Sequence, residues 1–581
     1  MQPETKTHSA SSVQACQNCK KEFVIEPDDF SFYEKIKVPA PTWCPECRML
    51  RRLSFRDFRV LYKRKSDWSG EDIFSIFSNS SPVKVYEREI WWSDKWDPME
   101  YGQDYDFLKP FFEQLKELFF KVPQPSQTMW NAVNSEYCTG SKDVKNCYLT
   151  WVLTFCEDMM YSAWANKTRN SIDVTLAESS EECYESLGLM KSQKVFFSFD
   201  CEECSDVWFC KNLQGCMNCV GCTNLRNKNY YIFNQPYSKE EYRKKFLEFD
   251  FGSLKNLEDF AKKAEEFLSK SIVRFAHGKH NFDVSGEYIN NSKNVQNSYY
   301  INGGEDCKYC QYLITPSSKD CMDFSQWGEN SELIYETSSS GENSSRIKFS
   351  YRTYRSSRDC TYCMQCAGCE NCFGCVGLQK KQYCIFNKQY TKEEYGELVS
   401  KIITHMNEMP FIDKKGRIYK YGEFFPLELS PFSYNESIAF NNFPLSKEDA
   451  LAQGYTWKDR EEKDYKITLE PENVPDHIKD VTDEILKESI GCAHKGECSC
   501  GCTTAFKITK QELDFYRAHN IPIPRLCHNC RHVKRVKNQS PMKLWHRKCM
   551  HEGCLNEFET PYTPERPEIV YCESCYNNEV A

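Results

Sequence analysis

The sequence of 581 residues contains no long hydrophobic run. A membrane-spanning helix needs about 18 or more consecutive apolar residues, so none is expected. The N-terminal stretch MQPETKTHSASSVQACQNCKKEF also lacks the apolar segment of a secretory signal. Catalytic signatures are missing as well, including a Walker-type loop, HExxH and GxSxG. We therefore expect a cytoplasmic protein without an evident catalytic site.

The sequence does contain 34 cysteines, together with 40% apolar and 14% aromatic residues. Without a secretory signal, so many cysteines favour a reduced metal-binding protein over a disulfide scaffold. The formal net charge is -9. Such an acidic chain is not expected to bind nucleic acid through its overall charge, although a local basic surface could still do so.

Paired cysteines near both ends predict zinc sites, because zinc prefers four thiolates in a tetrahedron. The first and second sets share a spacing of 25 residues between their pairs, with Phe23 and Phe506 in the same register. Pro39-x-Pro41 matches Pro522-x-Pro524 as well. We predict about three Zn²⁺ per chain in three sets, Cys16, Cys19, Cys44 and Cys47; Cys498, Cys502, Cys527 and Cys530; Cys549, Cys554, Cys572 and Cys575.

Some of these ligands have competitors nearby. Cys492 and Cys500 lie beside the second set, and either could replace Cys498. Four histidines are also close, and surface histidines without a metal are the preferred interpretation for them: His494, His528, His546 and His551.

Two basic segments accompany the predicted zinc sites. One follows the last cysteine of the first set, and the other includes the last two cysteines of the second set. These segments are 48–65 and 525–548, and the second contains no Asp or Glu. One hypothesis is a surface that contacts nucleic-acid phosphates. The preferred alternative is a solvated face or a face that docks onto the acidic middle of the chain. The residues that would contact nucleic acid are Arg48, Arg51, Arg52, Arg531, Lys534 and Arg535.

The middle of the chain is an internal repeat, in which 137–233 and 288–387 align with an offset of about 152 residues. Each copy contains aromatic-centred segments every 10 to 14 residues, separated by turn-forming residues. This pattern favours a β-solenoid-like stack, with a series of hairpins as the alternative. Each copy ends in a capping box that begins a helix, at Ser238 and at Thr391.

Within the repeats, cysteines fall on a grid of every third residue. The second copy has an unbroken series from Cys360 to Cys375, and the first has a series from Cys201 to Cys222 in which Val207 and Leu213 replace cysteine. Because apolar residues substitute there, packing of buried thiols is the preferred interpretation. Zinc and iron–sulfur ligation remain alternatives.

The predicted fold is multidomain and mainly β. It has treble-clef-like zinc ribbons at both ends of two Cys- and aromatic-rich β-solenoid-like repeats with capping helices. The expected units are 10–66, zinc ribbon 1; 67–129, connector with a helix; 130–236, repeat copy 1; 237–280, helical connector; 281–390, repeat copy 2; 391–410, capping helix; 411–490, linker; 491–540, zinc ribbon 2; 541–581, zinc ribbon 3.

The two long modules, CQNCKKEF…FY…PAPTWCPECR and CTTAFKI…FYRAHNIPIPRLCHNCRH, resemble probable treble-clef zinc ribbons. With CFGCVGLQKKQYCIFNKQYTKEEY and KLWHRKC…PYTPERPEIVYCESCY, nearly the whole chain is similar to an uncharacterised zinc-ribbon family of candidate-phylum bacteria. This resemblance implies zinc binding and no particular activity.

We therefore consider two main functions. The first is a zinc-binding structural or interaction scaffold with a protein partner. The second is a nucleic-acid or ribosome-associated factor that uses the basic segments. An iron–sulfur or redox protein is a third, weaker alternative. No small-molecule substrate is indicated.

Overall fold

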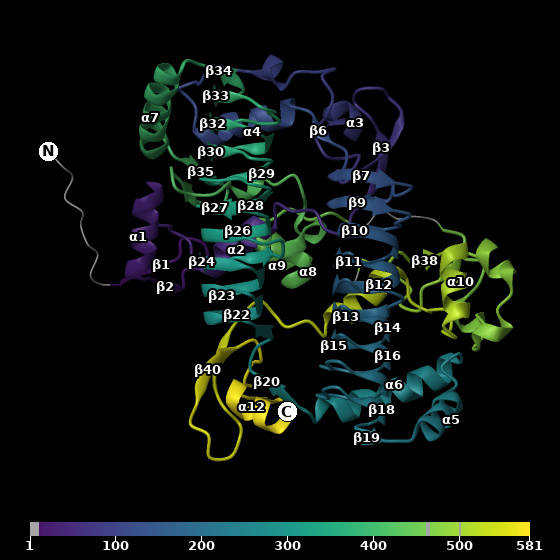
Figure 1. Ribbon diagram of the computed structural model, residues 1–581. Helices are drawn as coiled ribbons and strands as arrows, with labels where there is room; N and C mark the ends of the chain where they lie inside the picture. The colour runs from purple at the N-terminus through teal and green to yellow at the C-terminus, as the bar shows by residue number, and fades with distance from the viewer. Residues whose placement is uncertain (1–10, 460–464, 499–500, 581) are drawn as a thin grey trace.

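A computed structural model describes residues 11–459, 465–498 and 501–580. Two stacks of short parallel strands stand side by side (Figure 1). The chain descends the first stack from β7 (Met129–Val133) to β19 (Gln235–Pro236). It climbs the second from β22 (Phe282–Asn290) to β34 (Lys388–Gln389), so the two stacks run in opposite directions. Three small cysteine modules pack around them. The predicted multidomain, mainly β architecture is therefore confirmed.

The first coil stack (residues 129–236) advances by 12 residues per coil, as the pairs Lys142–Thr154 and Val174–Ser186 show. Its strands are β7 (Met129–Val133), β8 (Cys138–Thr139), β9 (Ser141–Lys145), β10 (Thr150–Met160), β11 (Ala163–Asn166), β12 (Arg169–Glu178), β13 (Tyr184–Met190), β14 (Gln193–Phe196), β15 (Phe199–Glu202), β16 (Ser205–Trp208), β17 (Met217–Val220), β18 (Asn229–Ile232) and β19 (Gln235–Pro236).

The coil is built from three-residue units. Every third residue from Gly140 to Phe233 has a positive φ, between 46° and 73°. This left-handed conformation turns the chain after each short extended segment. The residue that follows each turn points inward, and every third residue from Ser141 to Cys222 is at most 4% exposed. A coil of 12 residues therefore has four inward positions, which are occupied by Ser, Thr, Cys, Ala, Val, Leu or Met.

The second coil stack (residues 278–389) follows the same plan with steps of 11 to 14 residues, for example 14 from Cys307 to Cys321. Its strands are β21 (Gly278–Lys279), β22 (Phe282–Asn290), β23 (Lys293–Asn302), β24 (Gly304–Lys308), β25 (Gln311–Leu313), β26 (Ser318–Gly328), β27 (Ser331–Glu332), β28 (Tyr335–Gly341), β29 (Tyr351–Tyr354), β30 (Arg358–Thr361), β31 (Met364–Ala367), β32 (Glu370–Phe373), β33 (Gln382–Ile385) and β34 (Lys388–Gln389).

Helices follow the last coil of each stack. Both predicted capping boxes are confirmed, at Ser238 before α5 (Lys239–Phe249) and at Thr391 before α7 (Lys392–Glu408). Helix α6 (Leu254–Ser269) then leads to the second stack. Helices α5 and α7 pack beside β18 and β33, the last parallel strand of each stack. The two-residue strands β19 and β34 pair with them in the antiparallel direction and form the edges, which are too short to pair extensively with another chain.

Stacked aromatic rings join the two coil stacks. Tyr288, Tyr300 and Tyr312 lie one coil apart, with ring centroids 5.0 Å apart. Trp164 of the first stack continues the column at 4.3 Å from Tyr312. This contact fixes the relative position of the stacks over a face that would otherwise be apolar and exposed.

Two segments connect the coil stacks with the cysteine modules. The segment before the first stack contains β3 (Tyr62–Lys65), β4 (Asp72–Ser75), β5 (Val85–Tyr86), α3 (Arg88–Trp91), α4 (Phe111–Lys121) and β6 (Gln124–Pro125), and the segment after the second contains β35 (Phe411–Ile412), β36 (Ile418–Tyr419), α8 (Ile438–Asn442) and α9 (Lys447–Ala452). No helix in the described part of the chain is both long and apolar enough to cross a bilayer.

Candidate metal centres

Each cysteine module contains an antiparallel hairpin whose first strand ends directly before a cysteine. The hairpins are β1 (Ser12–Ala15) with β2 (Glu22–Ile25), β37 (Ile490–Gly491) with β38 (Ala505–Phe506), and β39 (Trp545–Lys548) with β40 (Glu557–Thr560). The cysteines after the first strands are Cys16, Cys492 and Cys549. In each hairpin a phenylalanine pairs with the residue two positions before that cysteine: Phe23 with Gln14, Phe506 with Ile490, Phe558 with Arg547.

The three modules also share a hydrogen bond to the first sulfur. The backbone N–H of the third cysteine donates to the first cysteine's Sγ, over 3.2 Å in the first and third modules and 3.3 Å in the second. The third cysteine immediately precedes a helix in every case. These helices are α2 (Pro45–Leu53), α11 (His528–Val536) and α12 (Glu573–Val580). The modules are therefore three versions of one local structure.

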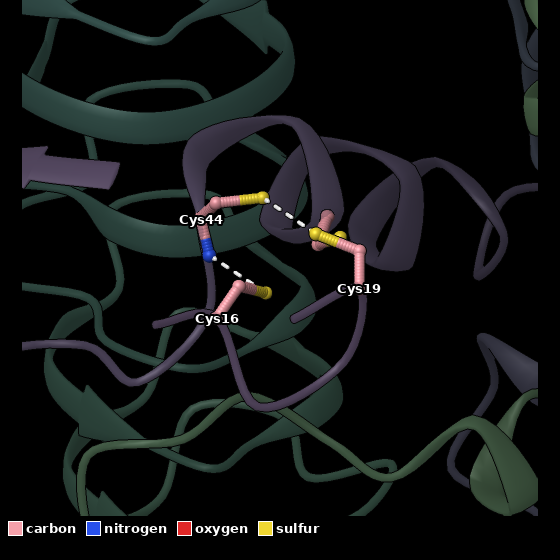
Figure 2. A group of neighbouring side chains, drawn as sticks. Cys16, Cys19 and Cys44 are labelled. Carbon is pink, nitrogen blue, oxygen red and sulfur yellow. Dashed lines mark hydrogen bonds between the residues drawn. The ribbon is translucent and has the colours of Figure 1, made fainter. Parts of the chain in front are cut away.

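The sulfur atoms lie at distances that suit a shared metal ion. In each module four Sγ atoms lie within 4.8 Å of one another. Cys19 and Cys44, labelled with Cys16 in Figure 2, have sulfurs 3.8 Å apart. The Cys554–Cys572 distance is 3.9 Å. Tetrahedral zinc with Zn–S bonds of about 2.3 Å would place its sulfurs about 3.8 Å apart. The thiolate sets therefore fit zinc in donor type, number and spacing.

The second four-sulfur group differs by one member from the predicted set. It consists of Cys492, Cys502, Cys527 and Cys530. Cys498 lies with His494 and Cys530 in a separate group instead. Cys500, the other predicted competitor, falls outside the described residues. Hairpin geometry explains the difference, since Cys492 occupies the position of Cys16 and Cys549, whereas the sequence prediction paired Cys498 with Cys502 four positions later.

Nearby donors favour the thiolate form at several ligands. The side-chain amide of Asn18 donates to Cys47 Sγ over 3.3 Å, and that of Asn556 donates to Cys572 Sγ over 3.4 Å. Burial acts to raise the pKa of Cys572, but the Asn556 bond and neighbouring thiols outweigh it and lower this pKa to about 6. In the second module the Cys492 thiol, followed by that of Cys530, lowers the pKa of Cys527. The same contacts between thiols raise the pKa of Cys530, so they favour one thiolate rather than four, and zinc, which binds thiolates, would displace the remaining protons.

The histidines near the modules have other contacts. His528 stacks on Tyr161 with centroids 5.1 Å apart, and His546 lies within 3.0 Å of both Glu557 and Glu559. Only His494 belongs to a ligand group among the described residues.

The helix of the first module inserts three arginines into the second coil stack. Arg48 and Arg52 donate to opposite oxygens of Asp323, each over 2.8 Å. Arg51 donates to Glu336 over 2.7 Å and to Glu423 over 3.1 Å. Asp323, Glu336 and the three arginines are almost completely buried. We call this set clamp 1 (Arg48, Arg51, Arg52, Asp323, Glu336 and Glu423).

The helix of the second module makes the equivalent contact with the first coil stack. Arg531 donates to Asp173 over 2.7 Å, and Arg535 donates to the other Asp173 oxygen over 3.3 Å. Glu185 lies 3.4 Å from Arg535. We call this set clamp 2 (Arg531, Arg535, Asp173 and Glu185). The docking is crossed, because each module binds the stack that is more distant from it in sequence.

Five of the six residues predicted to contact nucleic acid are therefore buried in ion pairs. Lys534 is exposed, and Arg48, Arg51, Arg52, Arg531 and Arg535 are buried. The interpretation preferred from the sequence had two forms. This burial contradicts the first, a solvated face, and agrees with the second, docking onto the acidic middle of the chain. The sequence contained a signal for the partners, since Asp173 and Asp323 occupy equivalent positions in the two repeats, but not for the crossed pairing.

The cysteine grid lies inside the coil stacks. Its thiols occupy inward positions, and Cys360 to Cys375 are fully buried at every third residue. Each contacts backbone carbonyls, as Cys363 does with the Cys372 oxygen at 3.5 Å. Among the described residues, no grid thiol belongs to a group of three or more ligand atoms within 4.8 Å of one another. This geometry supports packing of small side chains in a narrow core.

Comparison with known proteins adds little. No family model and no curated protein matches the sequence. Among solved structures, a putative acetyltransferase from Desulfovibrio desulfuricans G20 aligns over 50% of this chain and 86% of its own, with 9% identity and a TM-score of 0.10. Such a low score carries no argument about fold or activity. What the described residues establish is three four-cysteine groups, each of which could hold a metal ion, at the ends of a mainly β protein.

Proposed function

We propose that this protein is a zinc-stabilised scaffold, in which treble-clef-like zinc ribbons hold two β-solenoid-like stacks together to present them to a protein partner. One observation carries the proposal. In the first and second modules, the arginine helix begins at the second cysteine pair, and Arg48 and Arg531 directly follow Cys47 and Cys530. An ion bound there would fix the first turn of the helix and so the arginines of its clamp.

Metal removal tests this proposal. We expect at least three zinc ions per chain in the native protein, and one fewer in Cys44→Ser. Chelation should lower the melting temperature and open the Arg48 and Arg531 helices to protease, because binding energy at a structural zinc site is folding energy.

A matched control is Cys363→Ser, which changes a fully buried grid thiol outside the four-cysteine groups. Its zinc count should equal that of the wild type. A zinc-free protein with unchanged melting and unchanged proteolysis would refute the scaffold function.

A groove of ≈ 1230 Å³ beside the first coil stack offers a place for the partner. Helix α5, helix α10 (Lys510–Ala518) and the stack itself line it. Its floor includes Phe196 and Trp208, whose rings stack 4.3 Å apart, and its rim has both acidic and basic groups such as Asp514 and Lys194. An aromatic floor with a mixed charged rim suits an extended peptide segment better than a polyanion.

Selection of binding peptides from a displayed library tests this site. Peptides enriched on the wild type should lose binding to Leu247→Asp, because Leu247 is exposed and lines the groove. Leu108→Asp, at a similarly exposed leucine outside the lining, is the control and should bind normally. Equal effects of both changes would exclude the groove.

Nucleic-acid or ribosome association through 48–65 and 525–548 is the alternative function. The buried ion pairs of five arginines count against it. A low-salt filter-binding titration with RNA and DNA checks it: we expect no retention, and retention that falls on Lys534→Ala would support the alternative.

A further inference from the structure

The second cysteine module carries an insertion that the other two lack. Its first and second ligands, Cys492 and Cys502, are 10 positions apart, compared with 3 positions for Cys16 and Cys19. The insertion begins with a tight turn in which Glu497 N–H donates to the His494 carbonyl over 2.8 Å. The turn lies between His494 and Cys498, whose ligand atoms are within 4.8 Å of each other.

This turn brings two further ligand-type side chains to the four-cysteine group. The His494 ring nitrogen, Cys498 Sγ and Cys530 Sγ all lie within 4.8 Å of one another. The distance from Cys498 Sγ to Cys530 Sγ is 3.6 Å, close to the edge of a zinc–thiolate tetrahedron. His494 Nδ1 is buried and has no hydrogen-bond partner within the described structure. A metal ion in this group would be bound by one nitrogen of the His494 ring.

Cys530 belongs to both groups. Its sulfur is 3.9 Å from Cys492 Sγ and 3.5 Å from Cys527 Sγ in the four-cysteine group, and 3.6 Å from Cys498 Sγ in the other group. A thiolate has lone pairs for two metal ions, so one sulfur in this position can bridge them.

We propose that the second module holds a pair of zinc ions that share the Cys530 thiolate. The first ion has the four buried sulfurs of Cys492, Cys502, Cys527 and Cys530. The second is bound by His494, Cys498 and Cys530, which leaves a fourth tetrahedral position for water or an incoming ligand. This proposal rests on the proposed zinc binding of the module and adds a second ion to it.

The two ions differ in access. Cys502 is 4% exposed and the other three ligands of the first ion at most 1%, whereas His494 and Cys498 are partly exposed. The second ion therefore exchanges with solvent faster than the first. The module thus combines a buried structural zinc site with an accessible site that can exchange its ion for another thiophilic divalent cation.

Metal counting on the full-length reduced chain tests the pair. Native mass spectrometry and elemental analysis should find about four zinc ions in the wild type and about three in both Cys498→Ser and His494→Ala, because only the second ion is lost. A chromogenic zinc chelator should remove one more ion in the fast phase from the wild type than from either variant. His551→Ala is the control, since this histidine lies outside every ligand group of the described residues and should leave count and kinetics unchanged.

Two results would overturn the proposal. A wild type with three ions that remain three in both variants would mean that His494 and Cys498 bind none. A fall from three to two in Cys498→Ser would mean that Cys498 serves the first ion. In either case Cys44→Ser would still lose one ion, so zinc binding by the scaffold would survive. A wild type without zinc would refute both proposals.

Discussion

Clamp 1 and clamp 2 have the same arrangement of ion pairs, but clamp 1 has one more buried arginine. In both, the arginines at the first and fifth positions after the last cysteine form ion pairs with one buried aspartate. The fourth position differs, because Arg51 of clamp 1 is buried between Glu336 and Glu423, whereas its counterpart Lys534 is exposed. The shared contact is thus two arginines with one aspartate and one glutamate of the stack, and the fourth position of clamp 1 is an addition that uses Glu423 from the linker.

The largest effect is expected at the shared aspartates. Asp323→Asn and Asp173→Asn each leave two buried guanidinium groups without their main counter-charge, and loss of one partner of a buried pair costs about 3–5 kcal/mol. Chemical unfolding followed by tryptophan fluorescence should show losses in this range for both variants. A large loss for Asp323→Asn with none for Asp173→Asn would break the equivalence of the clamps.

The fourth position should separate the clamps. Arg51→Ala leaves Glu336 and Glu423 buried with less compensation and should cost about 3 kcal/mol. Lys534→Ala removes an exposed charge and should change the free energy of unfolding by about 0.5 kcal/mol or less. The same unfolding measurement compares them. Similar losses for the two variants would show that Lys534 contributes to clamp 2 in a way that its exposure does not suggest.

A smaller effect is expected from His277, which joins the stacks outside the clamps. Its ring lies 2.7 Å from Glu287 and 3.7 Å from Asp200. Burial lowers the pKa of His277, but these carboxylates raise it more, so the net shift is upward from 6.5. Its contribution is thus complete below pH 6.5 and is lost as pH rises through the folded-state pKa.

Melting curves at about pH 6, 7 and 8 measure this contribution, since they span the unfolded-state pKa of histidine. The wild type should lose more stability over this interval than His277→Gln, whereas the Asp323 and Asp173 variants should keep the wild-type slope. An identical slope for His277→Gln would contradict the assignment.

Short-range sequence patterns predicted much of the fold. They did not predict which coil stack each arginine helix docks onto. Cysteines occupy every third residue because this is the inward position of each three-residue unit. The period seen in the sequence is therefore the period of the coil. Capping boxes at Ser238 and Thr391 depend on residues only three apart, which is why they were predictable. The acidic partner of Arg51 lies 285 residues away, and no sequence spacing indicates which stack it belongs to.

The candidate sites show the same limit. Eleven of the twelve predicted cysteines lie in the four-cysteine groups, and Cys498 lies beside them. Cys492 was the harder residue to assign, because the insertion separates it from Cys502 and hides its equivalence to Cys16. The register of Phe506 with Ile490 is what relates the two modules, and it requires the strand pairing to be known.

The crossed docking also sets an order in time for a chain that is made from its N-terminus. Arg51 must wait for Glu336, 285 residues later, which at about 5–20 residues per second is about 15 to 60 s of synthesis. During that interval the cysteines of the first module have been synthesised, but the carboxylates of clamp 1 have not. A metal ion could therefore bind these cysteines before docking, and the arginines of clamp 1 have no acidic partner in the second stack until that stack has been synthesised.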